Sequence, residues 1–152
     1  MKASLPLEEF LPYRLVRASE LVSRRFAARY RTAYGISRPE WRTFAILGET
    51  GRTTATEISR RSTMHKTKVS RAVAALEKRG WLSRRADVAD RRIEHLELSS
   101  SGAAVYAELA AMARDFQAAL REEIGADAAA ALEAGLAAVE ARFVSLEAAE
   151  DE

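Results

Sequence analysis

The chain of 152 residues contains no cysteine, only two histidines, seven glycines and three prolines. Without cysteine, disulfide bonds, thiolate metal ligands and cysteine-based redox sensing are excluded. The two histidines, His65 and His95, do not have the close spacing of a paired metal-ligand motif, so we expect no metal site. Few glycines and prolines, set against long stretches rich in Ala, Leu, Glu and Arg, favour helices over sheets.

The sequence also has little that points to a membrane, a secretion route or catalysis. It contains no run of 18 apolar residues, and its N-terminal segment turns acidic at Glu8 and Glu9, unlike a signal peptide. We therefore expect a cytoplasmic protein with no membrane partner. A glycine-rich phosphate loop, a nucleophile elbow and a spaced Ser/His/Asp set are all missing, which predicts that the protein is not an enzyme and needs no cofactor.

Charge is distributed unevenly along the chain, although the formal net charge is only +2. Residues 51–98 contain twelve Lys and Arg against six Asp and Glu, whereas residues 99–152 contain three against eleven. A basic segment followed by an acidic one is typical of a protein that meets phosphate through one part of its chain. A solvated charged face gives the same count, so charge alone leaves nucleic-acid binding open.

Apolar residues recur at helical spacing through most of the chain, and the predicted fold class is mainly α. The first stripe predicts a helix over residues 7–34, which Gly35 ends. Ser and Thr, each followed three residues later by Glu, predict helix starts at Ser37 and at Thr54. A fourth helix is predicted over residues 65–79, closed by a glycine.

The rest of the chain, from residue 81 onward, predicts a hairpin and two long helices. Two strand-like pieces, residues 81–85 and 93–98, flank a polar loop and predict the hairpin. The fifth helix is broken at Gly125, and Asp127 is predicted to cap the sixth. An apolar seam suited to packing on another helix runs along the sixth helix and consists of Leu132, Leu136, Val139, Phe143 and Leu146.

Two short helices with a tight turn between them, followed by a basic hairpin, predict a winged helix-turn-helix. The N-terminal half of the second short helix presents side chains that reach base edges and phosphates: His65, Lys66, Thr67, Lys68, Ser70 and Arg71. The hairpin, or wing, carries arginines suited to a minor groove: Arg84, Arg85, Arg91 and Arg92. Between them, Asp87 and Asp90 are expected to orient neighbouring arginines through charge-assisted hydrogen bonds.

Four segments of this region, residues 67–71, 76–80, 90–92 and 98–102, together resemble the MarR family of transcriptional regulators. The resemblance extends from about residue 10 to residue 143. It implies that the helix before the wing is the recognition helix, that the run Asp90, Arg91 and Arg92 shapes the wing, and that terminal helices form a dimer. The chain departs from the family at His65, where Asp or Ser is a common helix cap, and at the wing tip, which has no arginine between Asp87 and Asp90.

The resemblance also implies a domain plan. Residues 1–152 are expected to form a single domain, with α+β character confined to a small hairpin wing. Within it, residues 36–98 form the DNA-binding lobe, and residues 7–34 and 103–148 form the dimerisation helices.

A second, narrower likeness concerns a small-molecule effector. The stretches 10–15 and 39–42 are similar to family members that respond to aryl carboxylates or their coenzyme A thioesters. The likeness implies a pocket in which Tyr13, Trp41 and Phe44 stack on the effector, and Arg14 or Arg42 binds its carboxylate. A role in the hydrophobic core remains open for Trp41 and Phe44.

These inferences predict a homodimeric regulator that binds a pseudo-palindromic operator on double-stranded DNA and, by default, represses until an aromatic effector releases it. The alternative is an architectural DNA-binding protein that contacts phosphates without operator choice or effector. A third reading, an interaction adaptor with a degenerate winged helix, does not account for the basic middle segment.

Overall fold

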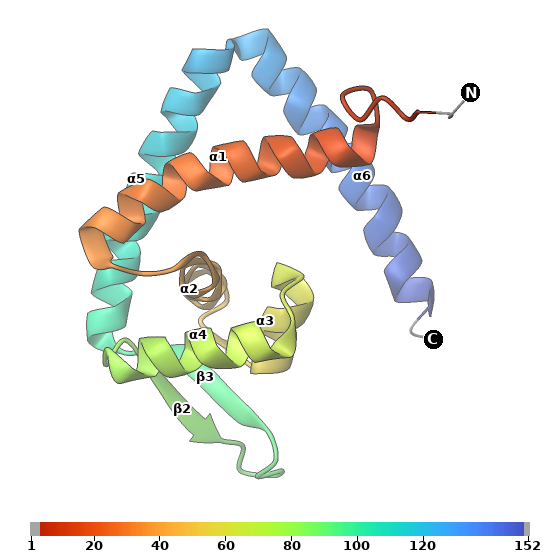
Figure 1. Cartoon of the computed structure of the whole chain (residues 1–152). Helices are drawn as coiled ribbons and strands as arrows, with labels where there is room; N and C mark the ends of the chain where they lie inside the picture. Colours follow the sequence, from red (N-terminus) through yellow and green to blue (C-terminus); the bar gives the residue numbers. More distant parts are fainter. Residues whose placement is uncertain (1–3, 151–152) are drawn as a thin grey trace. The chain divides into compact units, whose positions relative to one another are not determined.

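A computed structural model describes residues 4–150, with side chains described through residue 144. The chain divides into two compact units, Met1–Ala111 and Met112–Glu152. None of the described helices is both long and apolar enough to cross a membrane. Six helices and three strands are found in the described residues (Figure 1): α1 (Leu11–Tyr34), α2 (Arg38–Thr50), β1 (Arg52–Thr53), α3 (Ala55–Ser62), α4 (Lys66–Lys78), β2 (Leu82–Ala86), β3 (Glu94–Leu98), α5 (Ser100–Ile124) and α6 (Ala126–Glu150).

The helices of the first unit start and stop where the sequence supplies caps. The Ser37 hydroxyl accepts a hydrogen bond from the Glu40 amide at 3.3 Å, and the Thr54 hydroxyl accepts one from the Glu57 amide at 3.2 Å. Both predicted N-caps are confirmed, and each stabilises its helix by about 1 kcal/mol. Gly35 ends α1 with a φ of 66°, in the left-handed region that glycine adopts without strain.

The first helix is shorter than its apolar stripe predicts. It begins at Leu11, not at residue 7, because the chain before it forms a turn closed by a hydrogen bond from the Glu9 amide to the Pro6 carbonyl. Pro12 then occupies the first turn, where its missing N–H leaves no helical hydrogen bond unmade.

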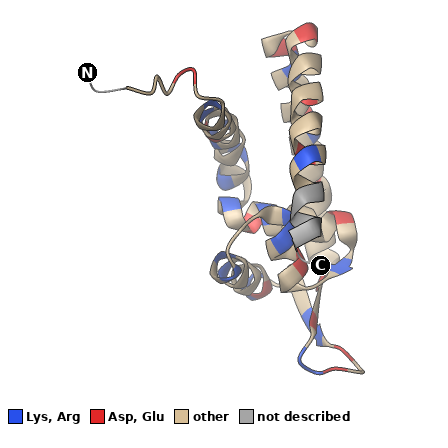
Figure 2. Cartoon of the chain, turned by 90° about the vertical axis from the view of Figure 1, so that its right-hand side faces the viewer, with Lys and Arg blue, Asp and Glu red and all other residues tan. Residues whose placement is uncertain are grey.

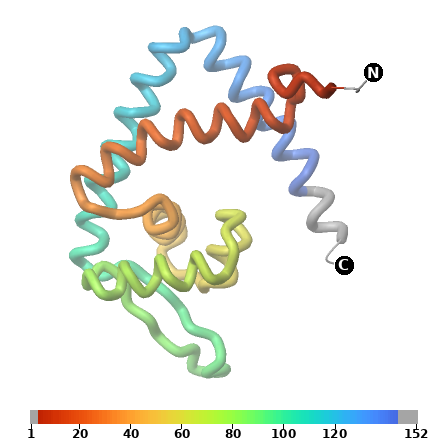
Figure 3. The backbone as a smooth tube through the Cα atoms, in the orientation of Figure 1, coloured from red at the N-terminus to blue at the C-terminus, as the bar shows by residue number. Residues whose placement is uncertain are grey.

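The three strands form one antiparallel sheet in the order β1-β3-β2. The hairpin pairs Leu82 with Leu98 at its base and Ala86 with Glu94 towards its tip, which confirms the predicted wing. The strand β1 was not predicted: Arg52 lies opposite Glu97 and Thr53 opposite Leu96. The hairpin projects from the rest of the lobe (Figure 3).

The core of the first unit holds α4 against α2, α3 and the sheet. On α4, Val69, Val73 and Leu76 are fully buried, as their spacing predicts. Apolar area buried in this way stabilises the fold by about 25 cal/mol per Å². The largest fully buried side chains of the described residues include Tyr30, Ile36, Phe44, Leu47, Ile58, Leu96 and Leu109.

A tight junction joins the base of the wing to α5. The Ser99 hydroxyl accepts a hydrogen bond from the Gly102 amide at 3.0 Å and so caps α5. The same hydroxyl donates to the Gly80 carbonyl at 2.6 Å, which holds the base of the wing against α5. The Ser101 hydroxyl reaches the same Gly80 carbonyl at 3.0 Å. A β-carbon on Gly102 would lie 2.0 Å from the Trp81 carbonyl oxygen, so only glycine permits this approach.

The second unit consists of the end of α5 and α6, joined at Gly125, whose φ is 90°. Asp127 does not cap α6, because the helix already begins at Ala126 and Asp127 lies in its first turn, where its charge favours the helix dipole instead. The side chain predicted last in the α6 seam, Leu146, lies outside the described side chains. The other four are exposed, by between 37% and 59%: Leu132, Leu136, Val139 and Phe143.

Candidate nucleic-acid interface

The helix α4 has one buried face and one exposed polar face. Its buried positions anchor it to the lobe, which leaves the side chains between them directed away from the core. All six residues predicted to contact DNA from this helix are exposed: His65, Lys66, Thr67, Lys68, Ser70 and Arg71. The face therefore offers three positive charges and three hydrogen-bonding groups within two turns.

His65 begins the helix as its N-cap and does not belong to its first turn. Its backbone is extended, and its Nδ1 atom accepts a hydrogen bond from the Thr67 amide at 3.2 Å. The departure from the usual Asp or Ser therefore leaves the start of α4 capped. An imidazole can accept at Nδ1 only while that nitrogen carries no proton.

The arginines of the wing divide into paired and unpaired side chains. Arg84 is held by two carboxylates, Glu77 on α4 at 2.9 Å and Glu94 on β3 at 3.3 Å. Arg85 pairs with Glu97 at 3.2 Å across the hairpin, although its side chain is still 73% exposed. Arg84 thus ties the wing to α4, a role that the sequence pattern did not indicate.

The unpaired or weakly held arginines lie near the wing tip. The Arg92 side chain is 94% exposed, and its Nε lies 3.7 Å from the Asp90 carboxylate. Arg91 is exposed beside it. Both line a cavity of about 570 Å³ together with Thr54 and Thr56 at the start of α3. Thr54 and Thr56 were not among the predicted contact residues, and only their spatial approach to the wing singles them out.

The two aspartates of the wing loop act differently. Asp87 accepts hydrogen bonds from the Ala89 and Asp90 amides at 2.8 and 3.0 Å and contacts His95 at 2.8 Å, so it shapes the loop and orients no arginine. The hydrogen bond with His95 and those from the two amides lower the pKa of Asp87 to about 2. The prediction that it orients arginines was wrong for Asp87.

Asp90 does contact an arginine, as predicted. Its carboxylate accepts from the Arg92 amide at 3.0 Å in addition to the contact with the Arg92 side chain. Basic and acidic segments are therefore interspersed along the wing, at the bottom of Figure 2. The fully exposed Val88 lies at the tip between the two aspartates.

Arg79 links the end of α4 to three other parts of the first unit. Its guanidinium donates to the carbonyls of Tyr34 at 2.8 Å and Gly35 at 2.9 Å, and it lies 5.0 Å from the centre of the Trp81 ring. A carboxylate oxygen of Glu40 lies 4.0 Å away. The sequence pattern does not indicate this role, because the carbonyls that Arg79 binds come from residues 44 and 45 positions earlier.

The five residues predicted to bind an effector do not surround one cavity in this conformation. Tyr13 and Arg14 line a cavity of about 170 Å³ on the first half of α1. Trp41 stacks on Tyr30, with ring centres 5.7 Å apart. Phe44 is fully buried and packs against Trp81, as the core alternative for this residue predicts.

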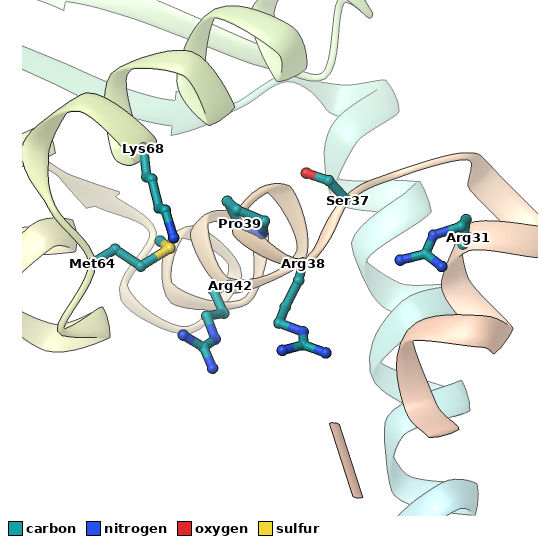
Figure 4. A pocket seen from close by; sticks show the side chains of 7 residues that line it. All are labelled: Arg31, Ser37, Arg38, Pro39, Arg42, Met64 and Lys68. Carbon is teal, nitrogen blue, oxygen red and sulfur yellow. The ribbon is translucent and has the colours of Figure 1, made fainter. Parts of the chain in front are cut away.

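The fifth residue, Arg42, lines a separate cavity of about 430 Å³ (Figure 4). We call this cavity the basic pocket. It is formed by the end of α1, the start of α2 and the start of α4, and its lining residues are Arg31, Ser37, Arg38, Pro39, Arg42, Met64 and Lys68.

In the part of the chain that the structure describes, no group of three or more His, Asp or Glu side chains is arranged to hold a metal ion. The polar side chains of this region instead form hydrogen bonds within the fold or face solvent.

Comparison with known proteins agrees with the fold and with the motifs. Residues 36–93 match the model of the MarR family, and no curated protein matches the chain in sequence. The structure is similar to that of the MarR family transcriptional regulator SPO1453 from Silicibacter pomeroyi DSS-3, with 28% identity, a TM-score of 0.75 and coverage of 90% of this chain and 99% of the other.

Two further solved structures are similar. A probable transcriptional regulator from Pseudomonas aeruginosa is 26% identical, with a TM-score of 0.71 and coverage of 88% of this chain and 98% of the other. NadR in complex with 4-hydroxyphenylacetate is 21% identical, with a TM-score of 0.71 and coverage of 91% and 94%. The fold, the match of residues 36–93 to the family model and these likenesses agree: the chain contains a winged helix of the MarR family type and is similar to MarR-family transcriptional regulators.

Proposed function

We propose that the protein binds a specific operator on double-stranded DNA, with α4 in the major groove and the wing beside the minor groove. The observation that carries the proposal is the division of α4 into a buried anchoring face and an exposed face bearing Lys66, Lys68 and Arg71. A helix with such a face fits the major groove, where Arg and Lys side chains distinguish guanine from other bases.

In this proposal the wing arginines have separate roles. Arg91 and Arg92, which are exposed, contact the minor groove or its phosphates, and Asp90 orients Arg92 for that contact. Arg84 is bound by two carboxylates, so it positions the wing relative to α4 and contributes little to DNA directly.

We further propose that two copies of the chain act as a homodimer through their terminal helices. The seam of Leu132, Leu136, Val139 and Phe143 leaves apolar side chains exposed along α6, and a second copy would bury them. A twofold axis then presents two recognition helices, so the operator is a pseudo-palindrome with half-sites about one helical turn apart.

Repression is the simplest consequence of such binding, because a dimer on a promoter excludes polymerase. The proposal includes the cytoplasmic location expected from the sequence and no enzymatic activity. A small aromatic carboxylate is the proposed releasing effector, supported by the 4-hydroxyphenylacetate held by NadR, with Tyr13, Trp41, Phe44 and Arg14 or Arg42 as its contacts. Because Phe44 is fully buried here, its contact requires a rearrangement of the pocket.

Fluorescence anisotropy on the intergenic DNA beside the protein's own gene, against scrambled DNA of equal length, tests operator binding. At near-physiological salt we expect binding on the order of a thousandfold tighter to the native fragment. Equal affinity for both fragments, followed by no enriched motif in a selection from random duplexes, would favour the architectural alternative.

A thermal-shift panel of benzoates, cinnamates and their thioesters tests the effector. A ligand that binds the folded state raises the melting temperature at saturating concentration. Comparison of Arg14→Gln with Arg42→Gln identifies which arginine holds the carboxylate. No shift with any compound would refute the aromatic effector while leaving operator binding untouched.

A further inference from the structure

The basic pocket concentrates positive charge from three helices. Arg31 comes from α1, Arg38 and Arg42 from α2, and Lys68 from α4. Figure 4 shows the guanidinium groups of Arg38 and Arg42 directed to the same side, with Arg31 directed towards Arg38. Burial raises the pKa of the Tyr30 hydroxyl, and the positive charges of Arg38, Arg31 and Arg42 oppose that rise, so three of the four cations act on one buried phenol.

Little negative charge balances this cluster. No Asp or Glu is among the residues that line the pocket. Arg38 is paired with Glu20 on α1, at 2.8 Å, and that pair lowers the pKa of Glu20. Within the described residues, the side chains of Arg31, Arg42 and Lys68 form no hydrogen bond or ion pair. Like charges held together without counter-charges repel one another, and a concave site of one sign focuses the field and attracts anions.

The chemistry of the lining selects the kind of anion. Guanidinium groups form paired, parallel hydrogen bonds with phosphate oxygens, and an ammonium group adds a point charge. A cavity of about 430 Å³ is large enough for a small molecule but has little aromatic lining to hold an apolar ring. We propose that the basic pocket binds a small ligand that bears a phosphate or pyrophosphate group.

The phosphate could belong to a free small molecule or to the DNA backbone. A duplex presents its phosphates on a convex surface, whereas these side chains line a cavity walled by α1, α2 and α4. The concave shape therefore favours the free ligand.

The pocket also shares a residue with the DNA-facing surface. Lys68 lines the pocket and is exposed on the N-terminal half of α4, where the proposed function has it contact DNA. One ammonium group cannot pair fully with a phosphate of the ligand and with DNA at the same time, so the bound ligand weakens DNA binding. This coupling rests on the proposed function, whereas the ligand site itself does not.

Isothermal titration of the full-length protein with inorganic pyrophosphate, without DNA, tests the site. Arg42→Gln removes one cation that has no partner in the fold, so the variant is expected to fold normally, which a thermal melt verifies. We expect its dissociation constant for pyrophosphate to rise about tenfold or more, the loss expected for one charge-assisted hydrogen-bonding group. Arg114→Gln, an exposed position on α5, removes the same charge outside the pocket and should change binding less than about twofold.

The proposed site would be overturned if the wild type does not bind pyrophosphate, or if Arg42→Gln and Arg114→Gln lose equal affinity for it. A second variant, Arg31→Gln, removes a pocket cation that α1 contributes. Its affinity for pyrophosphate decides the test if Arg42→Gln does not fold. If the two pocket variants lose operator affinity as strongly as pyrophosphate affinity, the cluster is a backbone-phosphate contact and the free-ligand assignment is wrong.

The coupling has its own test. Pyrophosphate should weaken operator binding of the wild type by more than sodium chloride of equal ionic strength does, because only pyrophosphate occupies the pocket. Equal effects of the two salts would overturn the coupling. A wild-type protein that binds pyrophosphate but selects no operator would instead contradict the proposed function and leave the site standing.

Discussion

Around the wing, individual side chains hold neighbouring backbone in place by specific contacts. Ser99 and Ser101 both bind the Gly80 carbonyl, and Asp87 binds two amides of its own loop. Such contacts fix the path of the hairpin relative to α4 and α5. The surface proposed to bind DNA is thus supported by residues that need not touch DNA.

Gly102→Ala tests the close approach at the base of the wing. The added β-carbon would meet the Trp81 carbonyl oxygen, a backbone atom that cannot move without displacing β2. We expect a loss of about 1–3 kcal/mol in the free energy of unfolding, typical of overpacking, measured by urea denaturation. Ser100→Ala, at an exposed neighbouring position, is the control and should change stability by less than about 0.5 kcal/mol. Equal stability of the two variants would show that the junction relaxes freely.

The pH dependence of the wing loop follows from Asp87. Its pKa falls from the ordinary 3.8 to about 2 in the folded protein, so its contribution to stability is fully present above about pH 4 and is lost as the pH falls towards 2. NMR titration of the Ala89 and Asp90 amides should therefore report a midpoint near pH 2. In Asp87→Asn that titration should vanish. A midpoint near 4 in the wild type would contradict the hydrogen-bonded loop.

Among the elements, those with a local signal could be predicted from sequence and those formed by distant partners could not. The caps at Ser37 and Thr54 depend on a glutamate three residues away, so the sequence contains the whole signal. The strand β1 is two residues long and becomes a strand only by pairing with β3, so no local periodicity announces it. Arg84 was predicted to face DNA. The sequence does not reveal that two carboxylates bind it instead, because these partners, on α4 and β3, are seven and ten residues away.

The same difference between local and distant signals explains which site residues could be predicted from the sequence. The helical period alone identifies the exposed face of α4, and all six residues named on it are exposed. The effector residues depend on how α1 and α2 pack, which the sequence does not reveal. The basic pocket was missed because its four cations are spread over residues 31–68 and meet only in the fold.

His65→Ala tests the cap at the start of α4. Loss of the Nδ1 acceptor leaves the Thr67 amide without its cap and should cost about 1 kcal/mol of unfolding free energy in urea. His65→Asn supplies another short acceptor and should retain most of that stability. If Asn and Ala are equally destabilised, the side chain does not act as a cap.

For the molecule as a whole, the proposed function depends on two copies of the lobe acting together. A single lobe offers few base contacts, whereas two on one axis read both half-sites of an operator and multiply their specificity. The exposed seam of α6 is the apolar surface that we propose for that association.

Leu136→Glu tests this association. A charge in the seam would be buried without a partner, so we expect monomers in analytical ultracentrifugation and a large loss of operator affinity. Ala134→Glu is the matched control, because that exposed position lies on the opposite side of the helix from Leu136. A Leu136→Glu protein that stays dimeric would place the interface elsewhere.

Base reading by α4 is best tested at Arg71. The measurement is the affinity of wild type and Arg71→Ala for the selected operator and for each of its single-base variants, with Arg114→Ala as the charge control. We expect Arg71→Ala to lose about 1–3 kcal/mol of binding free energy on the operator and to discriminate less at one position of each half-site. A uniform loss on every sequence, or no loss beyond that of Arg114→Ala, would contradict base reading by this residue.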